Sequence, residues 1–475
     1  MGHLGRVSER NDPLVTAAPL PSGPAAPLRR IISGSPPARA GAARAPTRRL
    51  RVKPPTVPRE LARLYRAGQI DETDYSGDRA SWSAALGAAQ RQHGVRATEL
   101  EAVIANLSAI AAAGQLTPSR LPALFLTLDR NRQWWTTGPL PSTWQRVEFA
   151  GSQLVWQYYP GQGIELQVLA NFGKVDGLYS AGRSHYPQMR DLLGELMPLA
   201  ARRAGGLAWE YYFQFDGGSP PWISAMAEGT ALEALTRATR AFGRPDPYMQ
   251  VAAQLLPAFT VAPPAGVRVA ARRGARYLQY SFAPHTDIIN AFLQSLIGLY
   301  DYARASGSAE ARQLFAAGNA QAEAELPRFD TGAWSLYQPG VEDSLDYHKL
   351  VTGFLGQLCA RTHASVYCTT ARHFRAYLTT PPTLRLLTAR APAKTPFALR
   401  FALSKYSRVG IVVSNGTRQA FLTSADFGYG ADSFNVPPLS AGRYTVRLAA
   451  TDLAGNFARI IATLRVQAHE RPTHR

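Results

Sequence analysis

The sequence contains no uninterrupted apolar stretch of about 20 residues, so no segment is expected to span a membrane. The opening residues, MGHLGRVSERNDPL, are polar and do not resemble a signal peptide. HExxH, GxSxG, P-loop and GxGxxG motifs in a supporting context are absent as well, so nothing favours a metallohydrolase, a serine hydrolase or a nucleotide-dependent enzyme. We expect neither a metal ion nor an organic cofactor.

Cysteine is scarce, and the two cysteines, Cys359 and Cys368, lie close together in LCARTHASVYC. Such a pair is compatible with a small-loop disulfide, half of a metal site or two free thiols. Neither a CxxC motif nor a suitable histidine spacing supports metal, and the disulfide is favoured; Cys359 would otherwise suit a core position in a helix over 343–364. A disulfide implies an oxidising setting, which predicts an extracellular or cell-surface location, with the cytoplasm as the alternative.

Lysine contributes only 5 of the 52 basic residues, and the net charge of the chain is +19. A positive field favours nucleic acid, a membrane surface or an acidic polysaccharide. Residues 1–60 alone hold 11 Arg or Lys against 3 Asp or Glu, so the excess elsewhere is milder. Because arginine here accompanies abundant Ala, Gly and Pro, it indicates a GC-rich genome more than a nucleic-acid groove, and no nucleic-acid partner is expected.

Changes in composition divide the chain. Residues 1–55 are rich in Pro, Ala, Gly and Arg, without aromatics, and are expected to be a disordered tail, as is the short segment 468–475. Residues 56–145 show helical periodicity interrupted by glycines. Alternation around RVEFAGSQLVWQYYPGQGIELQV, near 146–168, predicts a hairpin or a pair of short strands.

From about 185 to 380 helical segments return, separated by aromatic-rich loops. The expected helices cover 187–204, 222–242, 247–258, 284–306, 308–326, 343–364 and 369–378. In the fourth, Pro284 would begin the helix and Thr286 or Asp287 would cap it. Paired helices whose loops carry the polar residues predict a mainly α domain over 146–382, an α/α toroid of the incomplete (α/α)6-like barrel kind, with a plain bundle as the alternative.

Short β-branched segments with turn signals such as Asn415-Gly416 occupy 383–467. Their spacing predicts a seven-stranded Ig-like β-sandwich of about 85 residues. Its expected role is that of an accessory module.

The loops of the helical region combine aromatic and hydrogen-bonding side chains, a mixture that suits a glycan cleft. Taken singly, each tyrosine also suits a packing role, His348 a buried position and Glu228 the first turn of a helix. The candidates are Trp209, Glu210, Tyr211, Tyr212, Asp216, Glu228, Tyr277, Gln279, Tyr280, Tyr337, Asp346, Tyr347 and His348.

Several motifs resemble the C-terminal helical domain of the D-glucuronyl C5-epimerases. They stand in the family's order: YYPGQ at 158–162, SAMAEG at 224–229, NAFLQSLIGLYD at 290–301, FDTGAWSLY at 329–337 and LDYHKL at 345–350. The likeness covers about 158–380. It implies an enzyme that removes the C5 proton of a D-glucuronic acid residue in a polymer and returns it from the opposite face, which needs two opposed acid/base groups.

Carried over position by position, Tyr280, Tyr337 and Tyr347 match active-site tyrosines of the family. A tyrosine can act as acid or base if nearby cations lower its pKa. Two positions depart: Gln279 replaces an acidic residue, and no arginine follows Tyr337 in its motif. Either Glu228, Glu210 or His348 substitutes for the lost acid, or the substrate differs, or the chain has kept the fold without the reaction. The expected substrate-binding residues are Trp209, Glu210, Tyr211, Tyr277, Gln279, Asn290 and Asp346.

The leading hypothesis is a uronate C5-epimerase-like enzyme, an isomerase acting on an acidic, uronate-containing polysaccharide. Tyr347 and a group near Tyr280 would form the acid/base pair, and Tyr337 would orient the carboxylate. A polysaccharide lyase or a glycoside hydrolase on the same toroid is a rival, the hydrolase using Glu210 and Glu228. A non-catalytic glycan-binding cell-surface protein is another, and a homodimer is left open.

Overall fold

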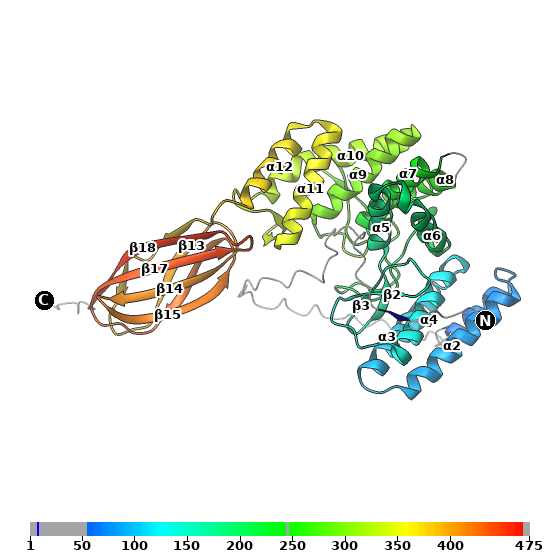
Figure 1. Ribbon diagram of the computed structural model, residues 1–475, viewed down its shortest axis with the longest axis horizontal. Helices are drawn as coiled ribbons and strands as arrows, with labels where there is room; N and C mark the ends of the chain where they lie inside the picture. Colours follow the sequence, from blue (N-terminus) through cyan, green and yellow to red (C-terminus); the bar gives the residue numbers. More distant parts are fainter. Residues whose placement is uncertain (1–6, 9–54, 244–246, 469–475) are drawn as a thin grey trace, which may run out of the picture. The chain divides into compact units, whose positions relative to one another are not determined.

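The computed structural model describes residues 7–8, 55–243 and 247–468 of the chain (Figure 1). The predicted disordered tails therefore fall almost wholly outside the described residues. Within the described part, the chain forms two compact units, which are treated separately. The first consists mainly of Arg29–Thr286 and Gln294–Gln321, and the second of Asp287–Leu293 and Ala322–Arg475. None of the described helices is both long and apolar enough to cross a bilayer.

The first unit begins with the helices predicted for 56–145. They are α1 (Val57–Arg66), α2 (Glu72–Arg91), α3 (Val95–Ala112) and α4 (Leu121–Thr137). The Asp71 carboxylate caps α2 by accepting a hydrogen bond from the Asp74 amide at 2.8 Å, which satisfies one of the free donors of the first turn. Helix α4 packs against both α2 and α3 and buries Trp134 and Trp135 completely.

The predicted strands around 146–168 are present as a small antiparallel sheet. Its strands are β1 (Val7–Ser8), β2 (Arg146–Phe149), β3 (Trp156–Tyr159) and β4 (Gly163–Leu166). The buried Glu99 carboxylate on α3 fixes the turn between β3 and β4 by accepting bonds from the Gly161 and Gly163 amides at 2.8 and 2.9 Å. Gly163 has φ +87°, and an added Cβ would lie 2.5 Å from Val103, so glycine is required there.

The remaining helices of the first unit alternate with short hairpins. They are α5 (Val168–Ala181), α6 (Tyr186–Leu196), α7 (Ala225–Phe242), α8 (Tyr248–Ala253), α9 (Ile289–Ser306) and α10 (Ala309–Glu325), the last two of which cross into the second unit. The hairpins pair β5 (Ala201–Arg203) with β6 (Gly206–Ala208) and β7 (Arg268–Ala271) with β8 (Gly274–Tyr277).

Several predicted helix boundaries were wrong. The helix expected over 187–204 ends at Leu196, because Pro198 follows and residues 201–208 form a hairpin. Helix α9 begins at Ile289 rather than at Pro284. Residues 283–286 form a turn instead, closed by a bond from the Thr286 amide to the Ala283 carbonyl. Helix α12 starts at Ser365, four residues before the expected position.

Helix α5 was not predicted at all. Residues 168–178 are buried apart from the half-buried Gly173, and a helix buried on all sides shows no polar face and hence no 3.6-residue periodicity. It packs between α6 and α7.

Helices α7 and α9 approach so closely that each requires a glycine at the contact. A Cβ on Gly298 would lie 1.9 Å from the Gly229 carbonyl oxygen, and a Cβ on Gly229 would lie 2.5 Å from the Ser295 Cα. Gly229 ends the SAMAEG motif, and Gly298 lies within NAFLQSLIGLYD. The two motifs therefore meet in space.

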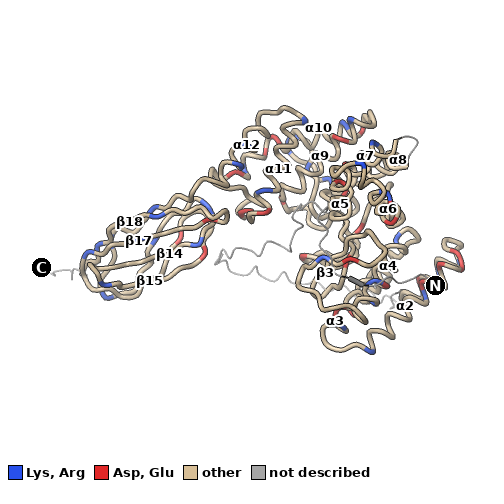
Figure 2. Tube along the Cα trace, viewed as in Figure 1, with Lys and Arg blue, Asp and Glu red and all other residues tan. Residues whose placement is uncertain are grey.

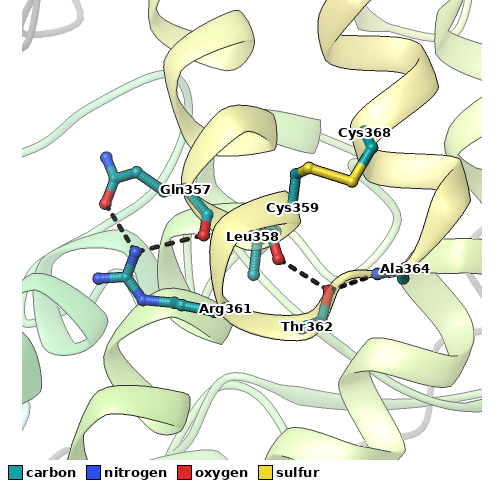
Figure 3. Close-up of a disulfide and its surroundings, with 7 residues drawn as sticks. All are labelled: Gln357, Leu358, Cys359, Arg361, Thr362, Ala364 and Cys368. Carbon is teal, nitrogen blue, oxygen red and sulfur yellow. Dashed lines mark hydrogen bonds between the residues drawn. A yellow bond between two sulfur atoms is a disulfide. The ribbon is translucent and has the colours of Figure 1, made fainter.

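The second unit contains the hairpin of β9 (Leu336–Gln338) and β10 (Val341–Glu342), then α11 (Leu345–Thr362) and α12 (Ser365–Tyr377). The favoured disulfide is present: Cys359 of α11 is bonded to Cys368 of α12 across the tight connection between the two helices (Figure 3). Helix α11 ends where His363 adopts a left-handed conformation with φ 57°. The Thr362 hydroxyl then accepts the Ala364 amide at 3.2 Å, which shapes the turn.

The C-terminal part of the second unit is a β-sandwich over the predicted range. One sheet has the strand order β11-β13-β16 and the other β12-β18-β17-β14-β15. The strands are β11 (Leu384–Leu386), β12 (Arg390–Pro392), β13 (Phe397–Leu403), β14 (Ser407–Asn415), β15 (Arg418–Phe427), β16 (Gly430–Val436), β17 (Gly442–Asp452) and β18 (Phe457–Gln467). Alternate residues of both sheets fill one apolar core, whose members include Phe401, Ile411 and Val446.

Buried polar contacts join the sandwich to the helices within the second unit. The Lys405 ammonium forms an ion pair with Asp452, both side chains at most 2% exposed, and donates to the Tyr377 carbonyl at 2.9 Å. The Glu342 carboxylate, at the end of β10, accepts the Tyr406 and Tyr429 amides, each at 2.8 Å.

Candidate functional site

The candidate residues fall into two groups, one in each unit. The first unit holds Trp209, Glu210, Tyr211, Tyr212, Asp216, Glu228, Tyr277, Gln279 and Tyr280. The second holds Asn290, Tyr337, Asp346, Tyr347 and His348. Each group of residues is positioned by the loops and helices of its own unit.

In the first unit, two loops run side by side at the N-terminus of α7. The Ala225 amide donates to the Leu278 carbonyl, and the Ser281 amide to the Ile223 carbonyl, each at 2.9 Å. Ser224 caps α7 by accepting the Ala227 amide. This pairing holds the loop that carries Gln279 and Tyr280 against the first turn of α7, where Glu228 lies.

Glu228 is a fully buried carboxyl group with one oxygen in use. Its Oε1 accepts the Trp209 amide at 2.9 Å, whereas its Oε2 has no hydrogen-bond partner among the described residues. Burial raises the pKa of Glu228 from 4.5 to about 8, although the bond from Trp209 and the charge of Arg203 act in the opposite direction. A carboxyl group that titrates near neutrality and keeps a free oxygen can serve as a proton donor or acceptor.

A small cavity of about 20 Å³ lies beside this loop, which is room for one water molecule. Its walls are mostly aromatic, and Gln279 contributes an Oε1 that has no hydrogen-bond partner among the described residues. Buried polar atoms are rarely left unpaired, so this oxygen marks a place where a polar ligand can bind. The cavity is lined by Tyr159, Gln167, Leu169, Tyr211, Phe213, Phe215, Trp222, Ser224, Gln279 and Tyr280.

Aromatic stacking fixes the tyrosines around the cavity. The ring of Tyr211 stacks on Trp222 with 4.2 Å between centroids, and Tyr280 stacks on Phe282 at 5.2 Å. Both tyrosines are about 5% exposed. Burial raises the pKa of the Tyr211 phenol, so this group stays protonated at neutral pH.

Glu210 is held differently from Glu228. Its carboxylate receives two bonds from Arg120, at 2.6 and 2.8 Å, and one from Arg203 at 2.6 Å, and it also accepts the Tyr212 hydroxyl at 3.1 Å. These four bonds occupy both carboxylate oxygens and hold the side chain in place. Glu210 is therefore poorly placed to exchange a proton with a substrate in this arrangement.

Trp209 and Tyr277 take part in packing. Each is 1% exposed; the Trp209 indole donates to the Leu196 carbonyl at 2.9 Å, and the Tyr277 hydroxyl donates to the Leu314 carbonyl at 2.7 Å. Neither polar group is presented to a ligand, so a substrate-binding role for these two residues finds no support in the geometry.

In the second unit, His348 lies at the centre of a buried network. Its Nδ1 lies 2.7 Å from the Ser335 hydroxyl, its Nε2 lies 2.8 Å from the Phe374 carbonyl, and its ring stacks on Trp334. Burial lowers the pKa of His348 to about 4, so the ring is neutral at pH 7. With both nitrogens bonded inside the protein, His348 is placed to position the loop before β9 rather than to take a proton from a substrate.

Tyr337 and Tyr347 are neighbours next to this network. Their ring centroids lie 5.1 Å apart in an edge-to-face arrangement, with Tyr337 half-buried and Tyr347 4% exposed. Asp346 is exposed in the first turn of α11, and the Asn290 side chain is 3% exposed. The structure thus brings together two of the three predicted phenols, and Tyr280 belongs to the other unit.

Residues 205–376 match the family model described as "D-glucuronyl C5-epimerase C-terminus". This part of the chain is similar to that family. The matched segment contains both groups of candidate residues, from Trp209 to His348.

Individual relatives agree with the family match over short lengths. A D-glucuronyl C5-epimerase of Caenorhabditis elegans is 34% identical over 131 residues, which make up 25% of this chain and 21% of that protein. An uncharacterized protein of Methanocaldococcus jannaschii is 26% identical over 138 residues, 28% of this chain and 44% of that protein. The chain therefore spans less than half the length of either relative.

Among solved structures, the cellobiose 2-epimerase from Bacillus thermoamylovorans B4167 gives a TM-score of 0.36 at 10% identity, over 54% of this chain and 70% of that one. Similarity at this level carries no argument about fold or activity.

Some residues of the site were not foreseen from the sequence. Arg120 lies 90 positions from Glu210 in the sequence, so no local motif indicates that the two residues pair. Ser335 and Asp343, which bond to each other beside His348, are ordinary loop residues in the sequence. Trp222 could have been found, because it follows a Pro-Pro break within the aromatic loop.

Proposed function

We propose that this chain is a uronate C5-epimerase that acts on an acidic polysaccharide. The observation that carries the proposal is Glu228: a fully buried carboxyl group with one unpaired oxygen and a pKa of about 8, inside the segment that matches the epimerase family. It can replace the acidic group that is missing at Gln279. Glu210 is paired with two arginines and His348 is sequestered, so Glu228 is the strongest of the three substitutes named by the resemblance.

In the proposed reaction, one group removes the C5 hydrogen as a proton, and the C5–H electron pair moves into the neighbouring carboxyl group to give an enediolate. A second group then donates a proton to C5 from the opposite face. No oxidant or reductant is consumed, and solvent restores the two groups. We assign the opposed roles to Glu228 and Tyr347, with Tyr280 and Tyr337 binding the uronate carboxylate and stabilising the charge that develops on it.

We propose that the helices from α5 to α12 form an incomplete (α/α)6-like toroid, and that the sandwich belongs to the Ig-like class. We also propose substrate-binding roles for Tyr211, Gln279, Asn290 and Asp346.

The rival reactions make different demands. A glycoside hydrolase using Glu210 and Glu228 needs one carboxyl group as acid and the other as base or nucleophile. Hydrogen bonds from Arg120, Arg203 and Tyr212 already occupy both Glu210 oxygens, which leaves this carboxylate poorly placed for either role. A lyase would share the C5 proton abstraction and differ only in the elimination that follows. The replacement of an acid by Gln279 favours a glycan-binding protein without catalysis as the second candidate.

We also propose an extracellular or cell-surface location, because the disulfide between α11 and α12 is stable in an oxidising setting. An acidic polysaccharide would be met there.

The test is incubation of the full chain with uronate polysaccharides in deuterated water, followed by NMR of the C5 position. Deuterium at C5 with inversion supports the epimerase. A new unsaturated product absorbing in the ultraviolet would instead indicate a lyase, and new reducing ends a hydrolase. Binding to the polymer without isotope exchange would favour the glycan-binding protein.

A further inference from the structure

The outer face of the five-stranded sheet in the sandwich carries an open groove. The groove has a volume of about 700 Å³. Its floor is formed by Gly410 of β14 and Ala449 of β17, which are paired across the sheet and have almost no side chain. Larger apolar side chains stand around them and are strongly exposed: Leu422 60%, Phe457 56% and Ile461 66%. Exposed apolar groups gathered in one recess are typical of a binding surface.

The same face is strongly basic. Alternation along the strands places Arg408 and five further exposed arginines on it, and Figure 2 shows basic positions along β17 and β18. Two of the five line the groove, and among the described residues none of the five has an acidic partner. The face carries one carboxylate within the described strands, Asp426, which is 3.5 Å from Arg408. The five arginines are Arg390, Arg443, Arg447, Arg459 and Arg465.

Three of these arginines stand in one row across the sheet. Arg465 of β18 is directly opposite Arg443 of β17 on one side and Arg390 of β12 on the other. Like charges opposite each other in neighbouring strands are destabilising, so this row opposes the folding of the sandwich unless an anion lies over it. It lies six residues along β17 from the groove floor at Ala449, or about 20 Å.

We propose that this outer face binds a strand of an acidic polysaccharide. The inference rests on the proposed function, because it identifies the polymer held by the sandwich with the polymer whose uronate residues are epimerised. Arg447 and Arg459 bind carboxylates in the groove, where the guanidinium fork matches both oxygens of a carboxylate. The apolar C–H faces of the sugar rings pack on Ile461 and Phe457. The arginine row extends the contact along the strand direction.

The shape of the face favours a chain over the other anionic partners. The exposed apolar side chains lie on strands around a recess, not on loop tips that could enter a bilayer. A recess with a glycine and alanine floor accepts a narrow polymer. A membrane surface, an acidic protein and a second copy of the chain are the other occupants that the experiment must separate.

The experiment measures binding of the full chain to polyglucuronate by calorimetry at two salt concentrations. Arg447→Gln combined with Arg459→Gln should raise the Kd about tenfold, because each arginine loses a charge-assisted hydrogen bond. Binding by the native chain should weaken as salt rises. The matched control is Arg385→Gln combined with Arg400→Gln: these two exposed arginines lie on the opposite sheet and their loss removes the same charge, so the Kd should change by less than about twofold.

A second variant, Ile461→Thr, tests the apolar part of the groove and should weaken binding of the polymer without altering its salt dependence. Circular dichroism should show the native fold in every variant, since all altered side chains are exposed. Isotope exchange at C5 is measured in parallel with a short uronate oligosaccharide that cannot reach both the sandwich and the catalytic region, and it should be the same in native chain and variants.

Equal affinity of the groove variant and the native chain for polyglucuronate would overturn the inference, even if isotope exchange proceeds normally. Binding to vesicles of anionic phospholipid but not to polyglucuronate would overturn it in favour of a membrane. A native dimer that Ile461→Thr converts to a monomer, with unchanged polymer affinity, would assign the face to self-association. Groove-dependent polymer binding without any exchange would uphold the inference and refute the proposed catalysis.

Discussion

Residues 61–382 and the sandwich at 383–468 differ sharply in how they use charge. The helical region holds 28 Arg and Lys against 26 Asp and Glu, whereas the sandwich holds 11 against 3. In the helical region, key charges are buried and paired, as in Glu210 with Arg120 and Arg203. In the sandwich, most arginines are exposed, and five of the six on the outer face of the five-stranded sheet lack a carboxylate partner among the described residues.

The difference shows what charge does in each place. A buried carboxylate between two guanidinium groups has a fixed geometry, and removing one partner would be costly. Such a carboxylate fixes the conformation of a loop, and its charge is not available to a ligand. Exposed and unpaired guanidinium groups contribute little to folding but remain available to an anion. Glu228 is one exception in the helical region, because it is fully buried and its Oε2 has no hydrogen-bond partner among the described residues.

The change that should have the largest effect is Glu228→Gln, which tests that exception. The amide keeps the shape but cannot transfer a proton, so we expect the rate of C5 isotope exchange to fall by about 10²–10⁴-fold. The measurement is deuterium incorporation by NMR under single-turnover conditions. Asp191→Asn, which alters an exposed acid on α6, is the control and should leave the rate unchanged. An undiminished rate in Glu228→Gln would remove this residue from the mechanism.

The pH dependence gives the same test a second readout. Between about 4.5 and about 8 the folded state keeps a proton on Glu228 that the unfolded chain releases, so this group makes the free energy of unfolding fall as pH rises through that window. The slope should flatten in Glu228→Gln, as measured by urea denaturation at several pH values. A catalytic inflection near pH 8 should disappear with it.

The next change contrasts a buried and an exposed ion pair within the sandwich. Asp452→Asn leaves the Lys405 ammonium buried without its counter-ion and should lower the free energy of unfolding by about 3–5 kcal/mol. Asp426→Asn removes the exposed partner of Arg408 and should change it by less than about 1 kcal/mol. If denaturant titrations show the same loss in free energy of unfolding for both variants, the distinction between the buried and the exposed ion pair is refuted.

A smaller effect is expected from removing the disulfide between α11 and α12, which includes none of the charged residues altered above. Cys359→Ser combined with Cys368→Ser opens a loop with a sequence separation of 9 and should lower the free energy of unfolding by about 2–3 kcal/mol. The native chain under reducing conditions should match the variant. Loss of stability in the variant alone would point to a packing defect instead.

The smallest effect concerns packing without charge. Gly298→Ala forces a methyl group into the contact between α7 and α9 and should cost about 2 kcal/mol, measured as a lower Tm. Gly353→Ala on α11 is the matched control: its Cβ would meet nothing within 4 Å, so the better helix propensity of alanine should raise stability by up to about 1 kcal/mol. A loss of stability in Gly353→Ala would instead show that a side chain at this position of α11 disturbs the packing.

Periodic elements were the most predictable part of the fold. Helices α1–α4, α7, α10 and α11 and the strands of the sandwich follow apolar patterns and turn signals that the sequence displays directly. The start of α9 was misplaced because Pro284 and Thr286 also suit a turn. Helix α5 has no polar face, so it left no periodic signal.

The site was predictable only as far as its residue types. The motifs led to Tyr280, Tyr337, Tyr347 and Glu228, but burial decides what each group can do, and burial depends on contacts between distant segments. The low pKa of His348 and the high pKa of Glu228 both result from such contacts. The arginines on the sandwich stood out in the composition only as an overall excess of charge.

Glu342 links the hairpin that carries Tyr337 to two loops of the sandwich through the Tyr406 and Tyr429 amides. If the sandwich moved away from the hairpin, the buried Glu342 carboxylate and the two amide donors would lose their hydrogen-bond partners. Each unpaired group would cost about 1–3 kcal/mol. We therefore expect the hairpin and the sandwich to move as one rigid piece. A polymer bound by the sandwich would then be held at a fixed distance from Tyr337 and at a high effective concentration, because no flexible linker separates the hairpin from the sandwich.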